Sequence, residues 1–213
     1  MSVADPAFTV PFLLFLVLAS LVIHNLRLRK ILNWSGIIFG LSYLSMSFYN
    51  KAKVNKIFET SLAEQGIEYN RHLITPTILN NILWNCIAEG DTVYHQGFYS
   101  LFDKKPLVKD IMTIPKLRHN SLKFENQREF ELLKWFSSGY YNVQPRNEVG
   151  KWQYNDLRFG SLRNSSDLDP KQDFIFSFIL QETPHGVIVR ENDEIPEERS
   201  EMAKGFFKRI MGE

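Results

Sequence analysis

The feature that most constrains the fold is an uncharged apolar run near the N-terminus. The sixteen residues from Phe8 to Ile23 carry no charge, and Ala7 together with His24–Leu26 extends the uncharged stretch. It then reaches about 20 residues, the length that a helix needs to cross ~30 Å of hydrocarbon. The run is apolar all round and lacks the polar face of a helix on a soluble core. The sequence therefore predicts a transmembrane helix over about 7–26.

A second uncharged run extends from Ile31 to Asn50 and is more polar than the first. Its two glycines, Gly36 and Gly40, are four residues apart and so share one face of a helix. Small residues at this spacing let another helix approach closely. We therefore expect a second span over 31–50, a two-helix membrane segment over residues 1–50, and a lipid bilayer as the partner of that segment.

Two alternatives to this interpretation stay open. The runs could be two buried core helices of a soluble protein, or the first run could be a signal peptide. The signal peptide fits poorly, because Asp5 precedes the run and the basic residues follow it. The orientation of the two helices in the membrane stays open. The basic turn at 27–30 favours a cytoplasmic turn and a domain outside the cytoplasm, whereas Lys51, Lys53 and Lys56 favour a cytoplasmic domain.

Charge divides the rest of the chain from this segment. Residues 1–50 carry four charges, whereas residues 51–213 carry 22 basic and 23 acidic side chains. The net charge of +1 gives no reason to expect nucleic acid as a partner. The single cysteine, Cys86, excludes a disulfide scaffold. We therefore predict that residues 51–213 form one α+β domain at the membrane surface.

Hydrophobic spacing in this second part predicts the order of its elements. An amphipathic helix carries Val54, Ile57, Phe58, Ser61 and Leu62 and ends at Gly66, and a short helix carrying Phe130, Leu133 and Phe136 ends near Gly139. A last helix begins at Pro196–Glu198, ends at Lys208 and Arg209, and carries a stripe of Met202, Ala203, Phe206 and Ile210. Residues 103–125, with six basic residues and two prolines, are expected to form a loop. The expected strands are 67–74, 82–88, 92–102, 140–144, 152–159, 174–180 and 187–190.

The predicted fold class is therefore α+β. Two N-terminal transmembrane helices precede an antiparallel β-meander with flanking helices, because turn sequences such as Glu89-Gly90-Asp91 join consecutive strands as hairpins.

The first polar group of interest is the segment PTILNNILWN (76–85), followed by Glu89 and Tyr94. Asn80 precedes a strand that carries Trp84. An asparagine side chain both donates and accepts hydrogen bonds, so Asn80 can hold the irregular backbone after Pro76. We favour this structural role over contact with a ligand.

The second group is NDLRFG (155–160). On a strand, Asp156 and Arg158 would share one face with Trp152 and Tyr154. The carboxylate and guanidinium then form a charge-assisted pair that stabilises the sheet, or they receive a polar ligand. We favour the structural pair over a ligand-binding role.

Metal-binding motifs are missing from the sequence. The five histidines (24, 72, 95, 119 and 185) do not lie three or four residues apart, and Cys86 has no CxxC partner. Asp5 is the only weak candidate ligand, and we expect this chain alone to hold no stoichiometric transition metal. The basic stretch 104–123 is read as a solvated loop, with contact to anionic lipid headgroups as the alternative.

The order of these segments resembles the YdjM-type family of bacterial inner-membrane proteins, which are described as membrane-bound metal-dependent hydrolases. The matching elements are the second hydrophobic run and six segments: ADPAFTVPFLLFLVLA (4–19), KIFETSLAEQGIEY (56–69), PTILNNILWN (76–85), YHQGFYSLFDKKP (94–106), FSSGYY (136–141) and YNDLRFG (154–160). The resemblance covers essentially the whole chain.

The resemblance implies an integral protein of the bacterial inner membrane. In the family, the metal ligands lie in an N-terminal membrane region that precedes the segment with which this chain begins. The chain is then expected to be the C-terminal part of a metal-dependent hydrolase, catalytically incomplete by itself, with that region as a partner and a divalent metal bound by the full-length protein. The alternative is a non-enzymatic membrane protein whose sheet domain binds lipid or a partner.

Overall fold

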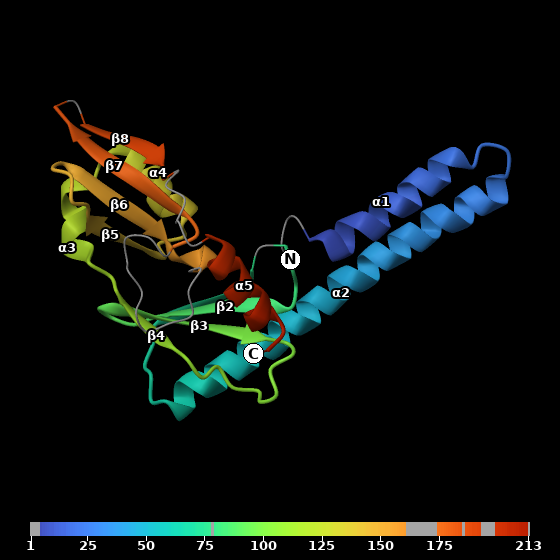
Figure 1. Ribbon diagram of the computed structural model, residues 1–213, viewed down its shortest axis with the longest axis horizontal. Coiled ribbons are helices and arrows are strands. Elements are labelled where there is room, and N and C mark those ends of the chain that lie inside the picture. Colours follow the sequence, from blue (N-terminus) through green and yellow to red (C-terminus); the bar gives the residue numbers. More distant parts are fainter. Residues whose placement is uncertain (1–4, 78, 161–173, 185, 193–198, 213) are drawn as a thin grey trace.

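The computed structural model describes residues 5–77, 79–160, 174–184, 186–192 and 199–212. It is an α+β fold in which an N-terminal helical hairpin precedes two antiparallel four-stranded sheets (Figure 1). The predicted α+β class is thus confirmed. The helices are α1 (Pro6–Leu21), α2 (Leu26–Glu64), α3 (Arg118–Ser121), α4 (Arg128–Phe136) and α5 (Arg199–Ile210), with 3-10 turns η1 (Leu122–Phe124) and η2 (Leu157–Phe159). The strands are β1 (Arg71–Pro76), β2 (Leu83–Glu89), β3 (Val93–Ser100), β4 (Met112–Pro115), β5 (Tyr141–Pro145), β6 (Lys151–Asp156), β7 (Ser177–Thr183) and β8 (Gly186–Glu191).

The two N-terminal helices form an antiparallel hairpin, and each is capped at its N-terminus. The Asp5 carboxylate accepts from the Ala7 amide at 3.0 Å, and the Asn25 side chain accepts from the Leu28 amide at 3.0 Å. The glycine face is confirmed, because a Cβ on Gly36 would lie 3.1 Å from Phe15 Cβ. Phe8 and Phe12 pack over Gly40 in the same way.

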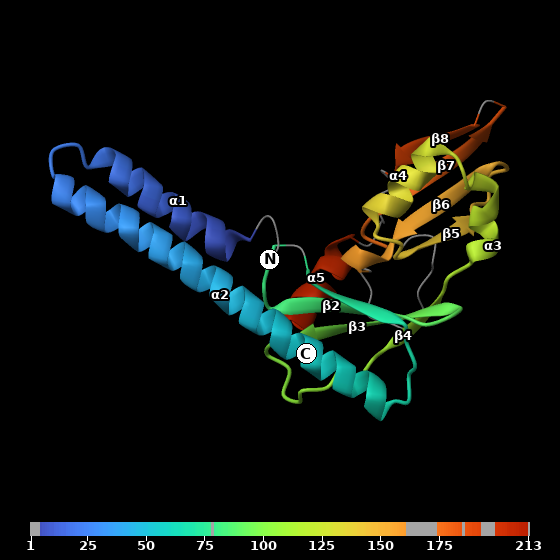
Figure 2. The same cartoon turned by 180° about the vertical axis from the view of Figure 1, so that it is seen from behind.

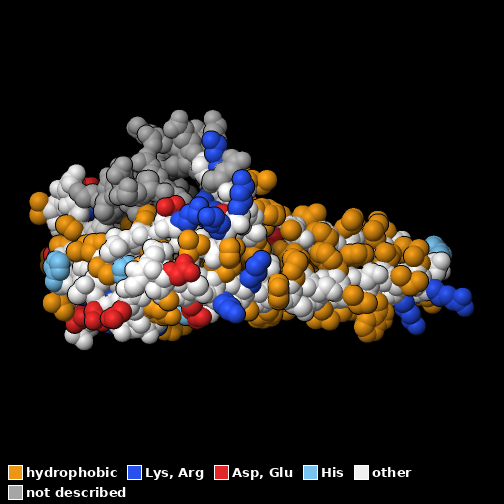
Figure 3. All heavy atoms as spheres, turned by 90° about the horizontal axis from the view of Figure 1, so that it is seen from below, with side chains coloured by type: hydrophobic (Ala, Val, Ile, Leu, Met, Phe, Trp, Pro, Cys, Tyr) orange, Lys and Arg blue, Asp and Glu red, His pale blue; other side chains and the backbone are white. Residues whose placement is uncertain are grey.

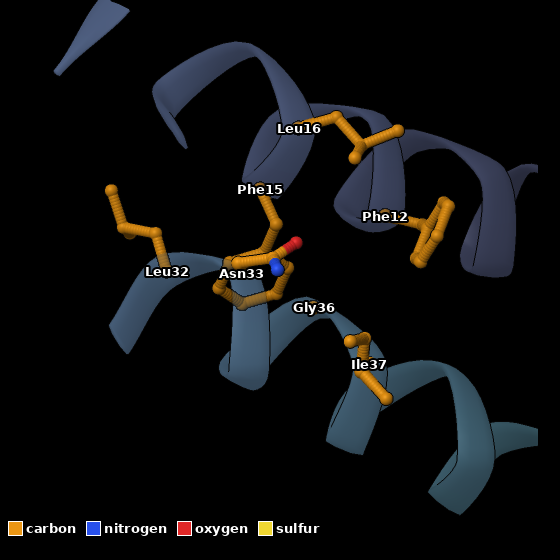
Figure 4. Close-up of a pocket in the computed structure, with 7 residues that line it drawn as sticks. All are labelled: Phe12, Phe15, Leu16, Leu32, Asn33, Gly36 and Ile37. Carbon is orange, nitrogen blue, oxygen red and sulfur yellow. The ribbon is translucent and has the colours of Figure 1, made fainter. Parts of the chain in front are cut away.

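The hairpin encloses a small apolar cavity of about 30 Å³ between its helices (Figure 4). This space has room for about two water molecules and is far smaller than a ligand pocket. Asn33 supplies the one polar side chain among its lining residues, which are Phe12, Phe15, Leu16, Leu32, Asn33, Gly36 and Ile37. The cavity is therefore a packing gap and no candidate for substrate binding.

One described helix, α2, is long and apolar enough to cross a bilayer. It contains the expected span 31–50. The helix α1, expected over about 7–26, runs only from Pro6 to Leu21, because residues 22–25 make the turn into α2. The expected turn at 27–30 is wrong, because these basic residues lie in the first turns of α2. The predicted N-terminal helical segment is thus confirmed. Of its two helices, α2 has the length and composition to cross a bilayer.

The second half of α2 is the amphipathic helix predicted over 54–62, continuous with the apolar half. Its buried side chains Val54, Ile57, Phe58 and Leu62 pack on one face of sheet 1 (β1–β4). The helix ends at Gly66 (φ 65°), where the Gly66 and Ile67 amides donate to the Ala63 and Leu62 carbonyls. The same helix therefore runs from the apolar hairpin into the core of sheet 1 without a linker.

Sheet 2 (β5–β8) has its own core beneath α4. Phe124, Phe130 and Leu133 pack on Tyr141 and Tyr154, together with Val143, Leu180 and Val187. A third cluster joins the opposite face of sheet 1 to the start of sheet 2; its buried members are Ile87, Tyr94, Ile114, Tyr140, Leu157 and Phe174. The expected single meander is thus two meanders, in strand orders β1-β2-β3-β4 and β5-β6-β7-β8.

Four predictions within the domain are corrected. Residues 103–125 are not a continuous loop, because they contain β4, α3 and η1; Ile114 of β4 and Phe124 of η1 are buried in the cores. The strand expected over 152–159 ends at Asp156, whose side chain caps η2. The strands expected over 67–74 and 174–180 begin later, at Arg71 and Ser177.

The last helix is present as α5, which ends in the basic residues Lys208 and Arg209 as expected. The predicted start at Pro196–Glu198 and the side chains of Met202 and Ala203 lie outside the described residues.

Candidate functional site

Four of the predicted candidates, Glu89, Tyr94, Asp156 and Arg158, lie along the seam between the two sheets. We define the seam as the face of sheet 1 that points away from α2, together with the residues of 138–141 and 157–158 that cover it. Since side chains alternate along a strand, Asn85 and Glu89 of β2 point to this face while Trp84 points to α2. Glu89 and Tyr94 are register partners on neighbouring strands.

At one end of the seam three cations surround Glu89. Lys116 Nζ donates to Glu89 Oε1 at 2.7 Å, Arg71 Nε donates to Oε2, and Arg118 lies 3.7 Å from Oε1. We call Glu89, Arg71, Lys116, Arg118 and Tyr94 the Glu89 cluster. Burial acts to raise the pKa of Glu89, but the hydrogen bonds and charges of Lys116 and Arg71 prevail and lower it. Glu89 is therefore a carboxylate that balances only part of the positive charge around it.

Aromatic rings hold these cations in place. The guanidinium groups of Arg71 and Arg118 lie 4.3 Å and 4.1 Å from the ring centroids of Tyr140 and Tyr141. Arg118 also donates to the Tyr94 hydroxyl at 2.7 Å and to the Gly139 carbonyl at 3.1 Å. The Tyr94 hydroxyl donates to the same carbonyl at 2.8 Å, and burial raises its pKa. The Tyr94 hydroxyl is thus a neutral hydrogen-bonding group that holds Arg118 and the Gly139 carbonyl, and it does not act as a base.

The chemistry open to the Glu89 cluster is binding. Arg71 is half-exposed and Arg118 partly exposed, so their stacked planar groups can meet an anionic group such as a carboxylate or phosphate. The cluster contains no activated nucleophile.

At the other end of the seam Asp156 and Arg158 form the predicted pair. Arg158 Nε and NH2 donate to Asp156 Oδ1 and Oδ2 at 3.0 and 2.7 Å, and the Arg158 amide donates to Oδ1 at 3.1 Å. The expected shared strand face is wrong, because Arg158 lies in η2. The two residues meet because Asp156 caps this 3-10 turn and accepts from the Arg158 amide, which places the guanidinium beside the carboxylate.

The backbone of η2 joins the two sheets through amide side chains. The Arg158 carbonyl accepts from Thr75 Oγ1 at 3.0 Å and from Asn85 Nδ2 at 2.9 Å. Gln96 Nε2 donates to Asn85 Oδ1 at 2.8 Å and to the Leu157 carbonyl at 3.1 Å. The pair and the amides thus act as structural contacts across the seam.

The predicted role of Asn80 is confirmed. Its Oδ1 accepts from the Ile82 and Leu83 amides at 3.0 and 2.7 Å, and its Nδ2 donates to Thr77 Oγ1 at 2.8 Å. Trp84 is buried against α2, and its indole nitrogen has no hydrogen-bond partner among the described residues. The candidates therefore belong to four separate places and do not form one site: Asn80, Trp84, Glu89 with Tyr94, and Asp156 with Arg158.

The donor set does not fit a metal centre. The Asp5 carboxylate caps α1 and also accepts from the Tyr43 hydroxyl, so both of its oxygens are engaged. Within the part of the chain that the structure describes, no three His, Cys, Asp or Glu side chains come together as a metal site would require.

The cations of the Glu89 cluster were missed by sequence reasoning. Arg71 looked like part of an ordinary strand, and Lys116 and Arg118 were counted in a solvated loop. Two features of the sequence could have pointed to the cluster: the concentration of basic residues in 104–123 and the glycine turn before Tyr140.

Comparison with family models, with curated proteins and with solved structures gave no match to this chain.

Proposed function

We propose that this chain is an integral protein of the bacterial inner membrane, with α1 and the apolar first half of α2 in the bilayer and the two sheets at its surface. The observation that carries this proposal is the apolar surface of the hairpin, which no described element of the chain covers. Large apolar side chains with more than half of their surface exposed occur on all sides: Val10, Leu13, Leu14, Leu21, Ile31, Trp34, Ile38, Leu41, Phe48 and Tyr49. A soluble monomer rarely exposes a continuous apolar surface of this kind.

Basic side chains bound this apolar surface at both ends. Figure 3 shows Lys and Arg atoms at the tip of the hairpin and again where the hairpin meets the domain. Arg27, Arg29 and Lys30 follow the tip, and Lys51 and Lys53 follow the apolar half of α2. Cations at this level can reach lipid phosphates while the apolar side chains lie in hydrocarbon.

Within this arrangement, we propose that the chain is the substrate-side, non-catalytic part of a metal-dependent hydrolase of the family that it resembles. The Glu89 cluster supports this role, because it offers stacked arginines to an anionic group and has no nucleophile of its own. The chemical step then depends on metal ligands from another segment.

A second candidate function is a membrane-anchored binding module with no chemistry, and the same cluster favours it. The DNA upstream of Met1 discriminates the two. An in-frame continuation into a histidine-rich membrane segment supports the hydrolase. A ribosome-binding site directly before Met1 supports the module.

Membrane integration is tested by carbonate extraction of the full chain from cell membranes. We expect the chain to stay in the pellet, and the double variant Ile38→Lys, Leu41→Lys to shift into the soluble or aggregated fraction, because lysine near the centre of a span is costly. The matched control is Leu122→Lys, Leu132→Lys, which changes equally exposed apolar residues of the domain. Release of the unmodified chain by carbonate would contradict the proposal.

A further inference from the structure

The C-terminal helix α5 is fixed to one end of sheet 1. Arg209 binds Asp103 with both guanidinium nitrogens, at 2.7 and 2.8 Å, and donates to the Phe98 carbonyl at 2.7 Å. The Ser100 hydroxyl donates to the Ile210 carbonyl at 2.5 Å. The helix end therefore sits on the turn that follows β3.

This end of sheet 1 is the one that faces the hairpin. Ser100 pairs with Leu83, and the neighbouring Leu101 amide donates to the Ile82 carbonyl at 3.0 Å. The preceding residue, Asn81, lies beside Tyr43 of α2, whose hydroxyl also binds Asp5 at the start of α1. Figures 1 and 2 draw α5 on the side of sheet 1 toward the hairpin. Thus α5 lies at the level where the chain enters the apolar helices.

The outer side of α5 is apolar. Phe207 and Met211 are 66% and 63% exposed, and their spacing of four residues places them on one face of the helix. Phe102 is exposed beside them, since its carbonyl lies against Gly212. Three exposed lysines, Lys104, Lys105 and Lys208, belong to the same two segments. We call these six residues the interfacial face.

We propose that the interfacial face rests on an anionic phospholipid surface. Phe207 and Met211 enter the boundary between headgroups and acyl chains, and the lysines meet lipid phosphates. The assignment follows from the position of α5 on the side of sheet 1 toward the apolar hairpin and from the three exposed lysines beside Phe207 and Met211, and it rests on the bilayer placement proposed above. The second contact holds the domain against the membrane in addition to α2.

The test uses the full chain in vesicles of phosphatidylcholine and phosphatidylglycerol. A fluorescent label is attached at Phe207→Cys, and quenching by lipids with a spin label near the headgroup is measured; the native Cys86 is fully buried and does not compete for the label. The positive control is Ile38→Cys near the centre of the span, measured with lipids that carry the spin label on the acyl chain. The negative control is Trp135→Cys, at the exposed end of α4. We expect quenching at 207 several-fold above that at 135.

The charge component has its own variant. Lys104→Gln, Lys105→Gln, Lys208→Gln in the labelled chain is expected to reduce quenching at 207, and high salt is expected to remove the difference between the two chains. The labelled chain that keeps its three lysines is also measured in vesicles of phosphatidylcholine alone. Quenching at 207 equal to that in the mixed vesicles would overturn the requirement for anionic lipid.

The outcomes separate the two proposals. Quenching at 38 but not at 207 overturns the interfacial face and leaves the membrane anchor standing. Quenching at neither position overturns both. In the unlabelled Phe207→Cys chain, treated with a thiol oxidant, formation of a disulfide-linked dimer would show a second copy of the chain on this face; together with absent quenching of the labelled chain it would likewise overturn the lipid assignment.

Discussion

Asp156 is a fully buried carboxylate whose charge is balanced within two residues. Its two oxygens accept three hydrogen bonds from Arg158, whose guanidinium also lies 5.0 Å from the Phe136 ring centroid. The Arg158 carbonyl binds sheet 1 through Thr75 and Asn85. Loss of this one arginine side chain therefore leaves a buried charge at the junction of both sheets.

We expect Arg158→Ala to lower the free energy of unfolding by on the order of 2–4 kcal/mol, because Asp156 then keeps a charge without a partner. The double variant Asp156→Asn, Arg158→Ala should cost less than the sum of the single changes. Denaturation of the full chain in detergent measures both, with the exposed Lys109→Ala as the control. A change in midpoint no larger than that of the control would contradict the structural pair.

Glu89 predicts a dependence of stability on pH. Because its pKa is lower in the folded chain than in the unfolded chain, it stabilises the fold above the unfolded pKa. That contribution is lost as the pH falls through the folded pKa. Glu89→Gln should therefore be most destabilising near neutral pH, where Lys116 loses its buried partner, and the difference from the unmodified chain should shrink on acidification.

The same titration on the exposed Glu125→Gln serves as the control. A destabilisation by Glu89→Gln that stays constant from neutral to acid pH would contradict a role for the Glu89 charge.

The residues that sequence reasoning placed correctly depend on near neighbours. Asn80 and the Asp156–Arg158 pair make their main contacts within three residues, so short motifs were sufficient to predict them. Glu89 and Tyr94 were singled out, but their partners Arg71, Lys116 and Arg118 arrive from other elements. Arg71 reaches the Ser138 carbonyl across 67 residues of sequence. Only the packing of the two sheets brings such groups together.

At the scale of elements, length and periodicity decided what could be predicted. The apolar run 31–50, the amphipathic stretch 54–62 and the glycine that follows them have strong local signals, and all three were expected; residues 26–30, expected in part as a turn, extend the same helix α2. The four-residue β4 has one buried residue, Ile114, and no alternation long enough to recognise. Its strand geometry comes from pairing with β3, which is a tertiary effect.

The α1–α2 hairpin depends on the close approach at Gly36. We expect Gly36→Leu to destabilise the hairpin by about 1–3 kcal/mol, because a Cβ there already lies 3.1 Å from Phe15 Cβ and the helices must separate. Ser45→Leu, at an exposed position of the same helix, is the matched control. Disulfide crosslinking between cysteines placed on α1 and α2 reports the separation, and unchanged crosslinking in Gly36→Leu would refute it.

At the scale of the whole molecule, α2 is shared between the apolar hairpin and the core of sheet 1. Ala52 lies between the two parts on an exposed turn of the helix. We expect Ala52→Pro to cost about 3 kcal/mol or more, because proline removes a helical hydrogen bond and clashes with the preceding turn. Protease cleavage near residue 52 should rise, whereas Lys53→Ala should leave it unchanged. A cleavage rate equal to that of the control would show that the helix is not continuous there.

Because α2 is continuous, its length fixes the distance between the tip of the hairpin and sheet 1. A helix of 39 residues is about 58 Å long, roughly twice the thickness of the hydrocarbon layer. In the bilayer placement that we propose, the continuous helix α2 holds the sheets at one height above the bilayer centre, and they move only when the whole helix tilts or shifts along the membrane normal. We therefore expect a thicker or thinner membrane to displace the seam relative to the lipid headgroups, and so to change how far the Glu89 cluster projects into water.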